Sequence, residues 1–233
     1  MAENILLKPG EHQKVKWLLH MIIRVIVMGA MLIALSGRWD YWQGWVFLGV
    51  NLISATLIIL AFDLIDVLKE RMKPGPGIKS WDKVFWGFYG LSGTATFIIP
   101  PLDIRFAWLE PVSIIVYIPA FLIFLMTLSL LIRSMMVNRF FSSVVRIQKD
   151  RGQYVVDTGP YHYVRHPGYT ASLGFFISLP LILGSYLGLI PAVISIILII
   201  IRTRLEDKTL HQELEGYTDY ARRVKYRLIP GLW

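Results

Sequence analysis

Cysteine is absent from this 233-residue chain, and charged residues make up only 17% of it. The lack of cysteine excludes disulfide bonds, thiolate metal ligands and cysteine nucleophiles. A soluble domain of this length would carry more charge. Hydrophobic residues instead account for 55% of the sequence and gather in long blocks. The composition therefore predicts an integral membrane protein.

Six apolar segments can be judged against the roughly 20 residues that a helix needs to cross a bilayer. They cover approximately residues 15–36, 45–65, 84–101, 112–132, 170–185 and 187–201. The last two are short, and a turn-forming stretch from Gly184 to Gly188 separates them. We expect a tight helical hairpin there, with a single bent or partly re-entrant element as the alternative. The predicted fold class is all-α, a polytopic bundle of about six transmembrane helices.

Acidic residues are also scarce, with 16 against 24 basic residues and a net charge of +8. If the N-terminus is cytoplasmic, a six-span arrangement places every basic residue except Arg24, Arg38 and Arg105 at the cytoplasmic side. Such a bias is typical of cytoplasmic loops. We therefore expect a multi-pass membrane protein with cytoplasmic N- and C-termini. Topology accounts for the positive charge, so we expect no nucleic-acid partner.

Aromatic residues gather at both predicted interfaces, and we interpret them as anchors in the membrane boundary. The two groups are Trp39, Tyr41, Trp42 and Trp45 on the far side, and Trp81, Phe85, Trp86 and Tyr89 on the cytoplasmic side. We expect residues 1–133 to form a scaffold of four spans. The chemistry is expected in residues 134–233, which contain the last two spans.

The most informative stretch is residues 159–169, GPYHYVRHPGY, which directly precedes an apolar run. Polar chemistry at the mouth of a membrane helix is costly unless it has a role. Pro167 disfavours a helical His166 and suits the first turn of the next helix. The free N–H groups of that turn would suit a carboxylate or phosphate, and Arg165 adds a positive charge. His162 and His166 lie four apart, but the prolines argue against a continuous zinc-binding helix, so we expect no metal.

A second polar cluster follows about forty residues later, around Arg202, Glu206 and Asp207. If the last span continues as a helix, Arg202 and Glu206 share a face at i and i+4. The alternative interpretation is a solvated amphipathic helix with exposed ion pairs, which contribute little to stability.

The two clusters together resemble the GPYxxxRHPxY motif and the closing pattern of isoprenylcysteine carboxyl methyltransferases and related phospholipid methyltransferases. The closing pattern is matched by Glu206-Asp207, Leu210, Tyr217, Tyr220, Val224, Arg227 and Ile229-Pro230. The family usually has paired glutamates where this chain has Glu206-Asp207. Residues 144–148, VVRIQ, also fit, and the resemblance covers roughly residues 134–233.

The resemblance implies methyl transfer from S-adenosylmethionine, with S-adenosylhomocysteine as product, to a lipophilic small molecule or lipid. An isoprenylcysteine-type carboxylate is one such acceptor, and amines, hydroxyls and thiols stay open. Cytoplasmic helices and loops would close the cofactor pocket. The implied catalytic residues are Glu206 and Arg227. The implied cofactor-binding residues are Gln148, Gly159, Tyr161, Arg165, His166, Pro167, Tyr169, Glu206 and Asp207.

The chemistry of these side chains agrees with that cofactor. An acidic side chain suits its ammonium group, Arg165 beside a helix start suits its carboxylate, and tyrosine faces suit its sulfonium. Two alternatives stay open. One is an NADPH-dependent membrane reductase of the sterol reductase type, in which Arg165, Arg202 and Arg204 would bind a 2′-phosphate. The other is a non-enzymatic membrane scaffold or transporter.

Overall fold

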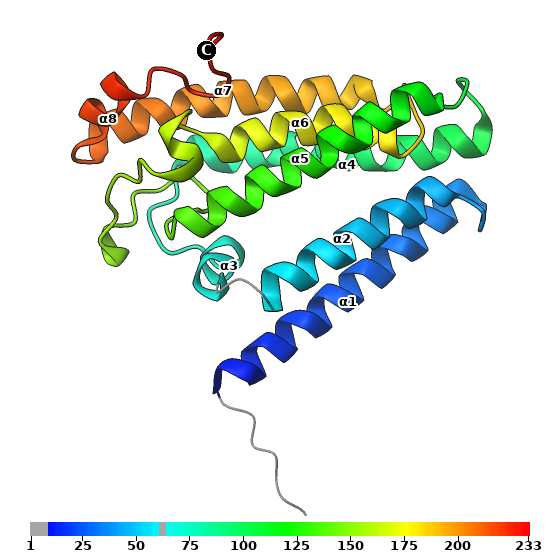
Figure 1. The fold of residues 1–233 in the computed structure, drawn as a ribbon, viewed down its shortest axis with the longest axis horizontal. Helices are drawn as coiled ribbons and strands as arrows, with labels where there is room; N and C mark the ends of the chain where they lie inside the picture. The colour runs from blue at the N-terminus through cyan, green and yellow to red at the C-terminus, as the bar shows by residue number, and fades with distance from the viewer. Residues whose placement is uncertain (1–8, 61–63) are drawn as a thin grey trace, which may run out of the picture.

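The computed structural model describes residues 9–60 and 64–233, and it is helical as predicted, with no strand in these two ranges (Figure 1). The long helices are α1 (Pro9–Ser36), α2 (Trp42–Leu60), α4 (Ser80–Phe106), α5 (Ile114–Val137), α6 (Pro167–Ile182) and α7 (Leu189–Glu213). The short elements are α3 (Ile65–Met72), α8 (Tyr217–Arg223) and the 3₁₀ turns η1 (Lys149–Arg151) and η2 (Gly159–His162). Residues 61–63, in the predicted second span, lie outside the described residues.

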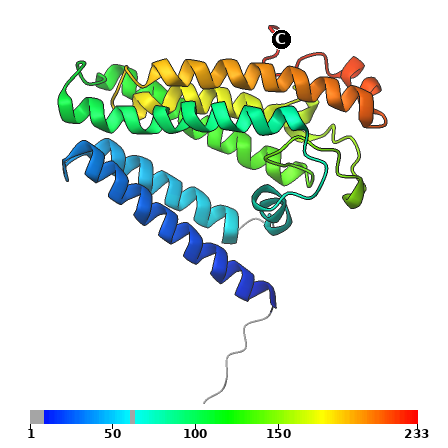
Figure 2. The same ribbon diagram turned by 180° about the vertical axis from the view of Figure 1, so that it is seen from behind.

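Helices α4 to α7 lie side by side in one bundle, and α1 and α2 form a hairpin that diverges from it at one end (Figures 1 and 2). Within the bundle α5 packs on α6, α6 on α7 and α4 on α7, while α1 contacts α4. The bundle thus joins helices from both predicted regions of the chain.

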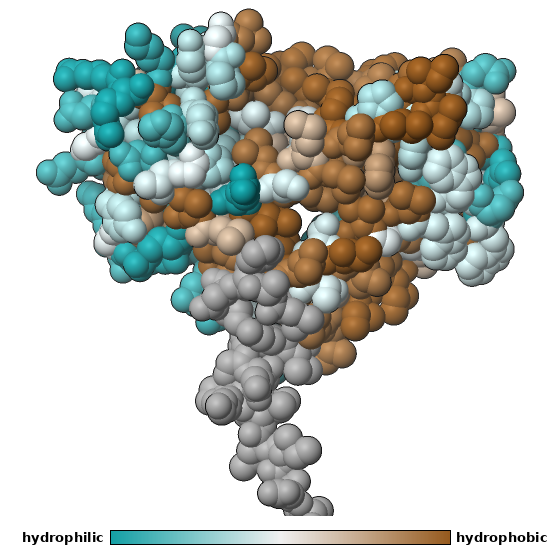
Figure 3. All heavy atoms as spheres, viewed as in Figure 1, coloured by the Kyte–Doolittle hydropathy of each residue, from teal (hydrophilic) through white to brown (hydrophobic). Residues whose placement is uncertain are grey.

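Length and apolar composition allow three of the described helices to cross a membrane. These are Lys16–Ser36, Trp42–Ile59 and Ile114–Val137, and Pro167–Ile182 is a shorter apolar helix. Hydrophobic residues form a band across the middle of the molecule in Figure 3, with hydrophilic residues at both ends. These features indicate a membrane protein. The arrangement of six spans remains a prediction.

The turn between α6 and α7 is tight, as the hairpin interpretation expects. Gly184 has a φ of 87°, which favours glycine, and the Ser185 N–H donates to the Pro180 carbonyl oxygen at 2.9 Å. The Ser185 hydroxyl donates to Asp103 Oδ2 of α4 at 2.6 Å and accepts from the Gly188 N–H at 3.2 Å. This network satisfies the polar groups of a buried turn.

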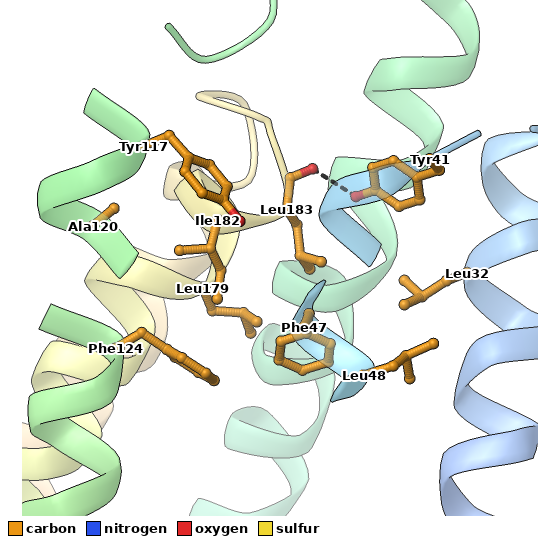
Figure 4. Close-up of a cluster of buried hydrophobic side chains, with 10 residues drawn as sticks. All are labelled: Leu32, Tyr41, Phe47, Leu48, Tyr117, Ala120, Phe124, Leu179, Ile182 and Leu183. Carbon is orange, nitrogen blue, oxygen red and sulfur yellow. Dashed lines mark hydrogen bonds between the residues drawn. The ribbon is translucent and has the colours of Figure 1, made fainter. Parts of the chain in front are cut away.

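A hydrophobic cluster joins the α1–α2 hairpin to the bundle (Figure 4). Its buried members are Leu32, Tyr41, Phe47, Leu48, Tyr117, Ala120, Phe124, Leu179, Ile182 and Leu183. The Tyr41 hydroxyl donates to the Leu183 carbonyl oxygen at 2.6 Å, and Tyr41 is only 3% exposed. The prediction that Tyr41 anchors the interface is therefore wrong, because the ring belongs to the core. Trp39, by contrast, is 74% exposed.

Candidate functional site

A cavity of about 220 Å³ opens at the end of the bundle where α3, α8 and the long loops gather. Its walls come from α3, α4, α5, residues 138–156, η2, the start of α6, one face of α7 and α8. Residues on both sides of position 133 therefore line it. The predicted boundary between a scaffold (residues 1–133) and a region that carries the chemistry (residues 134–233) does not separate the walls of the cavity. It stays a prediction about function.

One stripe of α7 faces this cavity. Ile199, Arg202, Glu206 and Leu210 all line it, at spacings of three or four residues that place side chains on one helix face. Arg202 and Glu206 were expected to share a face if the helix continued past the last span, and α7 does continue to Glu213.

The start of α6 brings the first motif to the same place. Pro167 is the first residue of the helix, as predicted, and His166 has φ −127° and ψ 61°, outside the helical region but short of fully extended. The expectation of free N–H groups is wrong for Tyr169 and Thr170. The N–H groups of Tyr169 and Thr170 both donate to the His166 carbonyl oxygen, at 2.9 and 3.1 Å, so neither is free for an anion.

Glu206 presents its carboxylate to the cavity. The Tyr169 hydroxyl donates to Glu206 Oε2, and the Tyr169 ring stacks on His166 with 5.7 Å between ring centroids. Tyr161 also lines the cavity, and its hydroxyl accepts from Asn138 Nδ2 at 3.1 Å. Burial raises the pKa of the Tyr161 hydroxyl above its ordinary value, so it stays protonated at neutral pH. No basic side chain in the described part of the chain pairs with Glu206.

Asp207, the next residue, is fully engaged inside the protein and is only 1% exposed. Arg165 donates to its two oxygens at 2.9 and 3.1 Å, Arg227 Nε donates at 2.8 Å, and the Tyr217 hydroxyl donates at 2.8 Å. His166 Nε2 lies 3.2 Å from Asp207 Oδ1. Burial alone would raise the pKa of Asp207, but the hydrogen bonds from His166 and Arg165 outweigh it and hold this pKa well below the ordinary value.

These contacts change what three of the expected site residues can do. Asp207 does not line the cavity, and neither does Arg227, whose guanidinium lies over the Trp233 ring at 5.1 Å. Arg165 lines the cavity but also donates to the carbonyl oxygens of Val224 and Lys225, at 2.9 and 3.0 Å. Arg165 and Arg227 both bind Asp207, and the expected roles of Arg165 toward the cofactor carboxylate, of Asp207 toward its ammonium and of Arg227 in catalysis stay predictions.

Three further expected residues shape the cavity through the backbone. Gln148 lines it, but its Nε2 donates to the Phe140 carbonyl oxygen at 2.7 Å and its Oε1 accepts from Arg151 at 2.6 Å. Gly159 opens η2 with a φ of 56°, and Pro167 opens α6. Neither Gly159 nor Pro167 lines the cavity, so both act on the position of Tyr161 and Tyr169.

A buried ion pair between α4 and α7 was not predicted from the sequence. Arg202 Nη2 donates to Asp82 Oδ2 at 3.2 Å, and Arg202 Nε lies 2.9 Å from Asp82 Oδ1. The Arg202 guanidinium lies over the rings of Phe85 and Trp86, at 4.5 and 5.3 Å from their centroids. Phe85 is 8% exposed and lines the cavity, so its interpretation as an interfacial anchor is wrong. A single aspartate between Lys79 and Lys83 was the available signal.

Residues 114–215, fewer than half of the chain, match the sequence model of the phospholipid methyltransferase family. The match confirms the resemblance to the superfamily of isoprenylcysteine carboxyl and phospholipid methyltransferases. No curated protein matches the chain.

The matched segment spans α5 to α7 and includes Glu206 and Asp207. Phe85 lies before it and Tyr217 and Tyr220 lie after it, and all three line the cavity. The cavity therefore combines walls from the segment with walls from the parts of the chain on either side.

Proposed function

We propose that this protein is a methyltransferase that takes its methyl group from S-adenosylmethionine and acts on a lipophilic or membrane-embedded acceptor. The observation that carries the proposal is the contrast between Glu206 and Asp207. Asp207 accepts hydrogen bonds from two arginines and one tyrosine hydroxyl, whereas Glu206 faces the cavity with one hydroxyl partner. A carboxylate so placed favours a cationic ligand. The family match supports methyl transfer.

The residues that line the cavity fit this cofactor, which supplies an electrophilic methyl group on a positively charged sulfur. Glu206 would hold the ammonium group of the cofactor. The aromatic faces of Tyr161 and Tyr169 suit its sulfonium. On the side away from the apolar helices, Val155 and Leu210 provide the apolar surface that a nucleoside base needs.

The chain itself contributes positioning and the exclusion of water. The N–H groups of Arg165 and His166 donate to the carbonyl oxygens of residues 226 and 227, both at 2.9 Å. The Thr170 hydroxyl donates to the Leu228 carbonyl oxygen at 2.7 Å. Residues 224–233, here called the strap, are thereby tied across the start of α6. The strap thereby fixes the start of α6, whose Gly168 and Tyr169 line the cavity.

The nature of the acceptor decides whether a base is needed. A carboxylate acceptor, such as the isoprenylcysteine type, attacks without losing a proton. An amine must first be neutral, and Glu206 or His166 would then accept its proton. Both side chains line the cavity.

We also propose that the cavity end of the bundle faces the cytoplasm, with six spans and both termini on that side. The basic residues of the 138–156 loop, the end of α7 and the strap lie at this end. Cytoplasmic loops of membrane proteins carry such an excess.

The reductase alternative has less support. It requires free arginines for a 2′-phosphate, yet Arg165 and Arg202 are each paired with a buried aspartate. Arg204 does not line the cavity.

Transfer of an isotopically labelled methyl group tests the proposal. The purified protein is incubated with labelled S-adenosylmethionine and a lipid extract, and labelled products are detected by mass spectrometry. We expect label in lipid with the wild type, and a loss of about tenfold or more in Glu206→Gln, because a charge-assisted contact is removed. Glu215→Gln is the matched control, since Glu215 is exposed and does not line the cavity.

Two results would contradict the proposal. One is the absence of labelled lipid with the wild-type protein. The other is an equal loss of transfer in Glu206→Gln and Glu215→Gln, because the effect would then be unrelated to the cavity.

A further inference from the structure

Arg71 is a cationic side chain that lines the same cavity from α3. Its guanidinium forms no hydrogen bond or ion pair with any side chain that the structure describes. It lies over the Phe141 ring, 5.0 Å from the centroid, and the residue is half-buried. The other cavity arginines differ, because each is bound to a carboxylate.

The acidic residue nearest in sequence is already engaged elsewhere. Glu70 accepts from Arg146 Nε and Nη2 at 2.9 and 3.0 Å, and Asp150 binds the same guanidinium at 2.7 Å. Glu70 is therefore neutralised by Arg146, and Arg71 is left without a counter-charge. Burial, and then the like charge of Arg202, lower the pKa of Arg71 below its ordinary value. An anion beside Arg71 would relieve both effects.

Arg71 lies beside an apolar part of the cavity wall. Leu131 of α5 and Trp86 of α4 line this part together with Phe141, whereas the Val155 side lies among the loops. The next residue, Met72, is 66% exposed, and Val84 at the start of α4 is 62% exposed. Exposed apolar side chains at this level suit contact with lipid. These exposed side chains give a lipophilic ligand an apolar approach to Arg71.

We propose that Arg71 binds an anionic group of the methyl acceptor, a phosphate or a carboxylate carried on an apolar chain. A guanidinium forms paired hydrogen bonds with either oxyanion, and its rigid plane over Phe141 favours that geometry. Glu206 would hold the cationic cofactor and Arg71 the anionic acceptor, so that the two charges of the cavity select two different ligands. The assignment rests on the proposed methyl transfer. Arg71 lies outside residues 114–215, so the family match assigns it no role.

Equilibrium binding of simple amphiphiles tests this proposal in the full-length protein in a non-ionic detergent. The probes are dodecyl phosphate, dodecanoate and the neutral dodecyl glucoside, each titrated with S-adenosylhomocysteine present and followed by tryptophan fluorescence. We expect an anionic probe to bind more tightly than the neutral one, and the tighter of the two anions identifies the preferred oxyanion. Arg71→Gln should weaken anion binding by about tenfold or more and leave the neutral probe unchanged.

Two variants control this experiment. Arg139→Gln removes an exposed arginine that also lies over an aromatic ring, Phe140, but does not line the cavity, so it should bind like the wild type. Arg71→Lys should retain part of the anion binding. The melting temperature of ligand-free Arg71→Gln should equal or exceed that of the wild type, because no ion pair with a described residue is lost.

The outcomes separate the two proposals. Equal binding of anionic and neutral probes by the wild type would overturn the role of Arg71. Loss of S-adenosylhomocysteine binding in Arg71→Gln with unchanged anion binding would also overturn it, because Arg71 would then belong to the cofactor. If the wild type binds no S-adenosylhomocysteine, the proposed function fails, and the amphiphile titrations still decide whether Arg71 is an anion site.

Discussion

Glu206 and Asp207 are neighbours in the sequence, but they lie on two faces of α7 and their carboxylates have opposite surroundings. On the cavity face, Glu206 has one hydroxyl partner and borders open space. On the face toward the strap, Asp207 binds two arginines and a tyrosine and is almost completely buried. The difference separates architecture from chemistry. A saturated carboxylate holds three segments of chain together, and an open one is available to a ligand.

The largest effect is expected when the saturated carboxylate is neutralised. Asp207→Asn leaves Arg165 and Arg227 without their counter-charge, and breaking a buried pair costs about 3–5 kcal/mol. The free energy of unfolding in detergent should fall by that amount. Glu206→Gln should lose far less, because its carboxylate is half-buried and pairs with no described cation. Equal destabilisation by Asp207→Asn and Glu206→Gln would contradict the claim that only Asp207 holds the fold together.

Low pH should also destabilise the protein through Asp207. The pKa of Asp207 is lower in the folded protein than the ordinary value of about 3.9, so its contribution is complete above that pH and declines as pH falls. For each group whose pKa is lowered in the folded protein, the free energy of unfolding changes by up to about 1.4 kcal/mol per pH unit. Melting temperatures between about pH 5 and pH 3 should fall less steeply in Asp207→Asn than in the wild type.

Some acid sensitivity should persist in that variant. The pKa of Asp150 is also lowered, by its hydrogen bond to Arg146. Identical slopes in Asp207→Asn and the wild type would show that Asp207 does not supply acid-sensitive stability.

A smaller effect is expected from packing on the cavity side. A Cβ at Gly168 would lie 2.5 Å from Phe141 Cε2, so Gly168→Ala must displace the Phe141 ring. Overpacking of this kind costs about 1–3 kcal/mol, and the moved ring should weaken ligand binding as well. Gly87→Ala in α4 is the matched control. It meets no atom within 4 Å and should stabilise the helix by about 0.5–1 kcal/mol.

Local rules predicted much of this site. The start of α6 at Pro167 follows from the fixed geometry of proline, and the shared face of Arg202 and Glu206 follows from the helical repeat. The helical class and the α6–α7 hairpin follow from the apolar blocks and the glycines between them.

The division of labour between Glu206 and Asp207 could not be predicted in this way. It depends on Arg165 and Arg227, which the fold brings to Asp207 from other segments. Asp82 and Arg202 are 120 residues apart in the sequence and meet only in the folded bundle. The aromatic residues near Asp82 looked like interfacial anchors because membrane boundaries and ligand cavities both attract such side chains.

The most direct test of the central claim is a thermal-shift measurement of cofactor binding in detergent. S-adenosylhomocysteine should raise the melting temperature of the wild type, with a stabilisation of about 2.7 kcal/mol at a hundredfold excess over Kd. Glu206→Gln should lose this shift, and NADPH should produce none. Stabilisation of the wild type by NADPH alone, or an undiminished shift with S-adenosylhomocysteine in Glu206→Gln, would contradict the account.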